Sequence, residues 1–147
     1  MDYKEILLSP IQIGTRTCPN RFFMQAMECN DEDELGNPSE LTLDRYQKLA
    51  EGEAGLVSLE AISITQESRS RDNQLTIMPQ NEKALADFVK KVKAVNPDML
   101  FIFQLTHSGE LSHPDFSRRV TVKPLYGYGG DLLTEEEVAK IVDDVVM

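Results

Sequence analysis

The stretch LFIFQLTHSG at residues 100–109 constrains the fold more than any other part of the chain. It begins with four large apolar residues directly after an Asn-Pro-Asp break, which is typical of a β-strand buried on both faces. It then becomes polar at Gln104, Thr106 and His107. A strand with an amide, a hydroxyl and an imidazole at its C-terminal end is typical of a parallel α/β sheet or barrel with a binding site there.

Apolar periodicity along the rest of the chain predicts alternating strands and helices. Two short apolar pieces around a turn-rich connector predict a leading hairpin, whose second strand extends toward Met27. Strand centres near residues 24, 58 and 102 are about one βαβ unit apart, which predicts parallel strands with right-handed crossovers. The expected hairpin pieces are residues 10–13 and 21–24, and the later strands begin at 55 and 100. The expected helices are 42–52, 81–95 and a third that a capping box opens at 134–137. The expected loops are 28–40, 65–74 and 109–133.

Composition excludes several classes of protein. The formal net charge of −10 argues against nucleic acid or an anionic membrane surface as a partner, since both attract basic faces. Cys18 and Cys29 are the only cysteines and lack CxxC spacing, so we expect no metal site and a reducing compartment. The N-terminal residues lack the apolar core of a signal peptide, and no window has the ~20 apolar residues of a membrane span. These features predict a cytoplasmic location.

Polar residues should converge where the predicted parallel strands end. Glu28, Glu60 and Gln104 each follow or end one strand, and such ends meet on one side of a sheet. A glutamine amide both donates and accepts hydrogen bonds, so Gln104 could bind the pyrimidine edge of a flavin or a nucleobase. It could equally be a buried amide that ties one loop to another. His107 fits a structural histidine better than a catalyst. Glu60 suits either a general base or an ion pair with an arginine, for which Arg69 or Arg71 is available.

Five ordered sequence blocks resemble the Old Yellow Enzyme family of FMN-dependent NADH:flavin oxidoreductases. The similarity spans nearly the whole chain. The family's next helix also resembles residues 134–142. The blocks are PIQIG at 10–14 with NRFFMQAME at 20–28, PSELT at 38–42 leading to Tyr46 and AEG at 50–52, AGL at 54–56 leading to Glu60-Ala61, and QLTHSG at 104–109.

The resemblance implies a (β/α)8 barrel with FMN at the C-terminal rim. Ala26, Met27 and Glu28 would contact the flavin largely through backbone atoms, Ala61 would do so through its backbone, and Gln104 would hydrogen-bond its pyrimidine edge. This sequence has Ala26 where the family usually has proline, and Glu110 where it usually has arginine.

A complete barrel needs ~250 residues. Residues 1–147 therefore predict a single partial barrel domain, the N-terminal segment of an FMN oxidoreductase, with about three β/α units after the hairpin. The substrate-anchoring residues that the family places after its fourth strand would lie beyond Met147, so the catalytic residues are unknown.

Three functional hypotheses remain open. The first is a portion of an NAD(P)H oxidoreductase that passes hydride through FMN to an activated alkene or a similar small-molecule acceptor. The second is an inert piece or subunit with a structural or complementing role, and the third is a small nucleotide-binding α/β module. A partial barrel leaves parallel edges unpaired, so we expect a complementing chain or a homo-oligomer.

Overall fold

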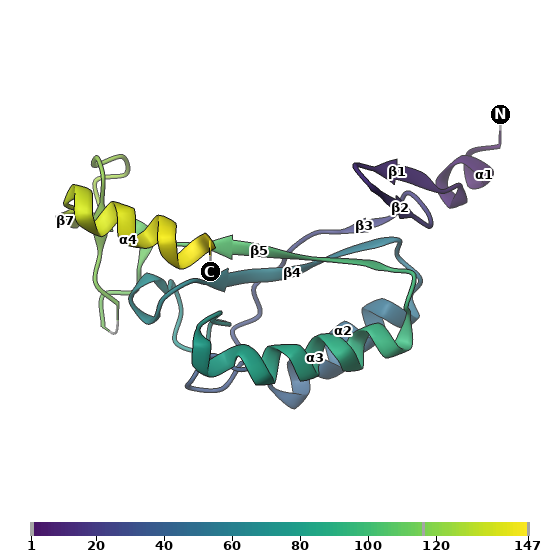
Figure 1. Cartoon of the computed structure of the whole chain (residues 1–147), viewed down its shortest axis with the longest axis horizontal. Helices are drawn as coiled ribbons and strands as arrows, with labels where there is room; N and C mark the ends of the chain where they lie inside the picture. The colour runs from purple at the N-terminus through teal and green to yellow at the C-terminus, as the bar shows by residue number, and fades with distance from the viewer. Residues whose placement is uncertain (1, 116, 147) are drawn as a thin grey trace.

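The computed structural model describes residues 2–115 and 117–146, and its centre is a parallel sheet of three strands in the order β3-β4-β5. The strands are β3 (Phe23–Met24), β4 (Leu56–Ser63) and β5 (Leu100–Thr106). Helices α2 (Glu40–Glu51) and α3 (Glu82–Val95) pack together on one side of these strands, as Figure 1 shows. The predicted parallel βαβαβ order is therefore confirmed.

Both covering helices follow from local sequence signals. Ser39 caps α2 and forms a capping box with Thr42, while Gly52 ends the helix. The 3-10 turn η2 (Pro79–Asn81) leads directly into α3. The apolar faces of both helices meet β4 in one core, whose fully or nearly fully buried members are Tyr46, Ala50, Val57, Leu59, Ile62, Leu75, Leu85, Phe88, Val92 and Met99.

The N-terminal region differs from the predicted hairpin. Helix α1 (Tyr3–Leu8) was not predicted, and the hairpin pairs β1 (Ile11–Ile13) with β2 (Arg16–Cys18). The second strand therefore lies within the expected connector, because Gly14 adopts a positive φ of 56° and turns the chain immediately after β1. Residues 23–24 instead form β3, which ends before Met27.

The polar segment at residues 65–74 is more buried than its hydrophilic sequence predicts. It contains the 3-10 turn η1 (Gln66–Ser68), and the Ser68 hydroxyl is 2.6 Å from that of Ser63 at the end of β4. Ser68 and Gln74 are buried, because neighbouring polar groups satisfy their hydrogen bonds. The predicted loop is confirmed, and the burial of these two side chains within it was not predicted.

Strand β5 is in the predicted place, but it is not buried on both faces. It lies at the edge of the described sheet, and Ile102, Phe103 and Leu105 are 44 %, 37 % and 42 % exposed. Only its N-terminal half is well covered: the Phe101 ring packs against Tyr46 and Phe88 of the two helices. An apolar run predicts a strand that can be buried, and burial also needs a neighbour on each side.

The C-terminal part begins with the 3-10 turn η3 (Gly109–Leu111). A parallel pair of β6 (Val120–Thr121) and β7 (Asp131–Leu132) follows, and then helix α4 (Glu135–Val146). The predicted capping box is confirmed: the Thr134 N–H donates to Glu137, and the Glu137 N–H donates to the Thr134 hydroxyl. Figure 1 places α4 near the C-terminal end of β5. Within the described residues, every helix is too short or too polar to cross a bilayer.

Candidate functional site

The strand register brings two of the predicted cofactor contacts together. Ala61 on β4 is the direct partner of Gln104 on β5, just after a register shift between Leu59 and Ala61. Phe101 and Phe103 point toward the helices, so Gln104 lies on the opposite face of the sheet, because side chains alternate along a strand. This face would be the interior of a closed barrel.

Gln104 is exposed, and among the described residues its side-chain amide has no hydrogen-bond partner. The alternative of a buried amide that ties loops together was wrong for Gln104. Gln74 has that role instead: its amide nitrogen donates to the Ala61 carbonyl at 3.0 Å, and its oxygen accepts from the Ser70 N–H at 2.8 Å. No periodic pattern predicted this role for Gln74, because it lies in an irregular polar segment.

The segment after β3 carries the other three predicted contacts, Ala26, Met27 and Glu28. Met27 is 67 % exposed, and Ala26 is partly buried. The Glu28 carboxylate pairs with Arg71 at 2.9 Å, and the next N–H, of Cys29, donates to the Glu60 carboxylate at 2.9 Å. These bonds hold the segment beside the end of β4.

Glu60 is buried, and its side-chain partners Arg45 and Tyr46 come from helix α2. Arg45 approaches its carboxylate at 3.3 Å and also pairs with Asp31. The Glu60 N–H donates to the Tyr46 hydroxyl at 2.9 Å, and that hydroxyl donates back to the carboxylate at 3.4 Å. An ion pair, one of the two alternatives for Glu60, is present, but its arginine is Arg45 and not Arg69 or Arg71. Arg71 pairs with Glu28. The pairing with Arg45 was not predicted, because Arg45 lies in the preceding helix, 15 residues before Glu60 in the sequence.

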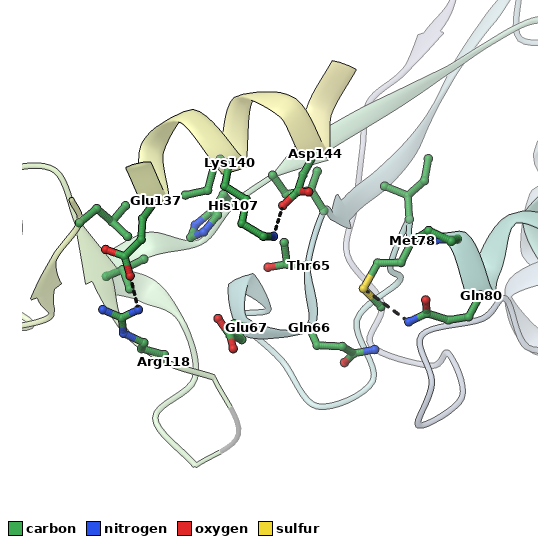
Figure 2. Close-up of a pocket in the computed structure, with 16 residues that line it drawn as sticks. Thr65, Gln66, Glu67, Met78, Gln80, His107, Arg118, Glu137, Lys140 and Asp144 are labelled. Carbon is green, nitrogen blue, oxygen red and sulfur yellow. Dashed lines mark hydrogen bonds and ion pairs between the residues drawn. The ribbon is translucent and has the colours of Figure 1, made fainter. Parts of the chain in front are cut away.

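His107 is placed as a structural residue. Its Nδ1 accepts the Gly109 N–H at 3.1 Å, and burial lowers the pKa of its imidazole. His107 also lines a cavity of about 580 Å³ beneath α4, where Figure 2 shows it with the Arg118–Glu137 and Lys140–Asp144 ion pairs. The five predicted cofactor contacts do not line this cavity.

Glu110, at the position where the resemblance leads one to expect arginine, has a role of its own. It is buried, and its carboxylate accepts the N–H groups of Leu125 and Tyr126 at 2.8 and 3.0 Å. These backbone donors lower the pKa of Glu110. Glu110 therefore anchors the glycine-rich part of the predicted loop at 109–133, before β7.

Comparisons with known proteins agree with this architecture. The sequence profile of the NADH:flavin oxidoreductase / NADH oxidase family matches residues 6–144. No curated protein matches the chain. Among solved structures, the Old Yellow Enzyme homologue from Zymomonas mobilis superimposes with a TM-score of 0.80 at 22 % identity, covering 94 % of this chain and 42 % of that one.

Two further structures show the same fold. Morphinone reductase gives a TM-score of 0.80 at 24 % identity, covering 94 % of this chain and 42 % of that protein. The 2-naphthoyl-CoA reductase complex gives a TM-score of 0.82 at 19 % identity, covering 95 % of this chain and 24 % of that protein. The chain thus spans less than half the length of these structures, and its fold is the leading hairpin and first β/α units of their (β/α)8 barrel. With residues 6–144 matched, the chain belongs to the NADH:flavin oxidoreductase / NADH oxidase family.

Proposed function

We propose that this chain forms the flavin-binding first part of an FMN-dependent oxidoreductase that takes hydride from NAD(P)H and passes it to a small-molecule acceptor such as an activated alkene. The observation that carries the proposal is the position of Gln104. Its amide is exposed on the face away from the helices, opposite Ala61 and at the C-terminal end of parallel strands.

The chemistry of these residues fits a flavin. The Gln104 amide offers a donor and an acceptor to a ring edge that presents both. Met27 exposes apolar surface against which a ring can pack, and the bonds of Glu28 and Cys29 hold the segment in place. The Ala61 carbonyl already accepts from Gln74, which orients the end of β4. Bound FMN would supply the two-electron hydride chemistry, while these residues bind and orient it.

The first experiment is a titration of FMN followed by flavin fluorescence, comparing the chain with Gln104→Leu, each mixed with a polypeptide that carries the later strands of a family barrel. Losing a hydrogen-bonding amide costs about 1–3 kcal/mol, so FMN affinity should fall roughly 5- to 150-fold. Gln47→Leu on α2 is the matched control and should bind as the unmodified chain does. Equal affinity of all three proteins would contradict the assignment of Gln104.

We also propose that a polypeptide carrying the remaining strands of the barrel completes the site by pairing with β5. The edge of β5 is exposed, and Phe103 and Leu105 line an apolar groove of about 800 Å³ together with Leu85 and Val89 of α3. A strand and its following helix would cover these side chains, as the consecutive units of a barrel do. The other possible partner is a second copy of this chain.

Titration of FMN into the chain, alone and mixed with the later strands of a family barrel, separates the alternatives. Binding only in the mixture supports a complementing chain. Binding by 147 residues alone, with NADH oxidation, would contradict the need for a partner. No binding in either case favours the second hypothesis, an inert structural piece. Sedimentation would identify a homo-oligomer, which Phe103→Lys should disperse because it places a charge in the apolar groove.

A further inference from the structure

A buried carboxyl group beside the proposed flavin contacts has no ordinary partner. Glu32 is only 3 % exposed, and neither of its carboxyl oxygens has a hydrogen-bond donor among the described residues. Burying an ionised carboxylate without partners is prohibitively costly, so a group in this position must be neutral or share a proton.

The neighbour of Glu32 is a second buried carboxyl group, that of Glu60, which is 1 % exposed. Glu60 already has three donors, the Cys29 N–H, the Tyr46 hydroxyl and the Arg45 guanidinium. Its charge is therefore partly compensated, although burial still raises the pKa of Glu60 as well. Among the described residues Glu32 has no hydrogen-bond donor, and the Glu60 carboxyl group is the side chain that interacts with it. One proton between the two oxygens would satisfy both side chains.

The surrounding charges leave no cation for Glu32. The charged and titratable groups that face the pair are Arg45 and Tyr46 from α2, and Glu28, Cys29 and Asp31 from the same segment as Glu32. Arg45 is shared between Asp31 and Glu60, and Arg71 is paired with Glu28. An ionised Glu32 would therefore face Glu60 with like charge in a buried site.

We propose that Glu32 keeps a proton on its carboxyl group and donates it to the Glu60 carboxylate, so that the pair latches residues 28–32 onto β4, and that losing this proton opens the latch. Deprotonation releases the proton to solvent and leaves two carboxylates that repel each other. Glu32 is then a positioning residue, acting through Glu60 on the Cys29 N–H and the segment before it.

The pKa of Glu32 agrees with this geometry. Burial and the neighbouring Glu60 charge raise it from 4.5 to about 8. The latch should be closed near pH 6 and largely open at pH 9. Its consequence for flavin binding rests on the proposed function, since Ala26, Met27 and Glu28 lie in the latched segment or directly before it, but the latch itself needs no FMN.

Amide hydrogen exchange in the full chain tests the latch, with each rate divided by its intrinsic rate at the same pH. With a pKa of about 8, the deprotonated fraction of Glu32 rises from about a hundredth at pH 6 to about nine tenths at pH 9, so protection of the Cys29 amide should fall roughly 90-fold over this range. In Glu32→Gln the amide donates at every pH, and protection should stay constant. Glu34→Gln, in an exposed position of the same loop, should behave like the unmodified chain.

A pH-independent protection of the Cys29 amide in the unmodified chain, or the same fall in protection in Glu32→Gln, would overturn the proposal. Infrared spectroscopy gives a second test that needs no folded variant. The unmodified chain should show the carbonyl stretch of a protonated carboxyl group at pH 7, and this band should disappear above pH 9. Its absence at pH 7 would also refute the latch. Because neither measurement uses FMN, failure of the latch and failure of the proposed function are distinguishable.

Discussion

Replacing Glu32 by glutamine should stabilise the folded chain increasingly as the pH rises. Glutamine keeps the shape of the protonated side chain and can donate to Glu60, but it cannot ionise. The folded-state pKa of Glu32 lies above its unfolded value, so between 4.5 and about 8 the folded state retains a proton that the unfolded state has lost. The stability of the unmodified chain therefore falls as the pH rises through this interval.

The size of the effect follows from the width of that interval. From 4.5 to about 8 is about 3.5 pH units, and each unit corresponds to about 1.4 kcal/mol, so the loss of stability has a ceiling of about 5 kcal/mol. Relaxation of the segment and entry of water would make the actual loss smaller than this ceiling. At pH 9 we therefore expect the free energy of unfolding of Glu32→Gln to exceed that of the unmodified chain by about 2–4 kcal/mol. Below pH 4 the two proteins should be nearly equally stable.

The measurement is urea unfolding of both proteins at intervals from pH 4 to pH 9. Other groups also titrate here: burial lowers the pKa of His107, so His107 adds stability as the pH rises through the neutral range. Subtracting the two curves removes this shared contribution and leaves that of Glu32. A difference that is constant with pH would refute the reasoning, because it would mean that Glu32 ionises in the folded chain as it does in the unfolded one.

Three further substitutions test the packing and the loops. Gly36→Ala should cost about 2–5 kcal/mol in denaturant unfolding, because Gly36 has a φ of +75° and a Cβ there would lie 2.3 Å from the Thr76 hydroxyl oxygen. Leu59→Ala removes a fully buried side chain from the core and should also cost about 2–5 kcal/mol by the same measurement. Glu110→Ala should expose the Leu125 amide to hydrogen exchange while the core amides keep their protection, since that amide loses its acceptor.

Elements with a strong local signal were predictable from the sequence. The apolar periodicity of α2 and α3 predicted those helices to within a few residues. Strands β1 and β2 were harder, because β2 is short and polar and its register depends on the turn at Gly14. The buried hydroxyl cluster at Ser68 was missed because hydrogen bonding, and not hydrophobicity, is what buries it.

The candidate site was predictable only where strand topology decides the position. Parallel strands bring their ends together, and this was enough to place Gln104 beside Ala61. The partners of Glu60 could not be predicted, because Arg45 lies on α2 and reaches Glu60 on β4 only through the packing of the helix against the sheet. The burial of Glu32 was equally hidden, since the sequence around it is acidic and reads as a solvated loop.

The exposure of β5 is informative because it contradicts the composition of the strand. Residues on both of its faces are apolar or suited to a ligand, yet Ile102, Phe103 and Leu105 are exposed at the edge of the described sheet. Exposed edges are normally blunted by charged residues or proline, and β5 carries neither. Selection for solubility alone would not retain such an edge, whereas a neighbouring strand would cover all three of these apolar side chains. The same neighbour would close the face on which Gln104 lies, so we expect that completing the sheet also completes the proposed flavin site.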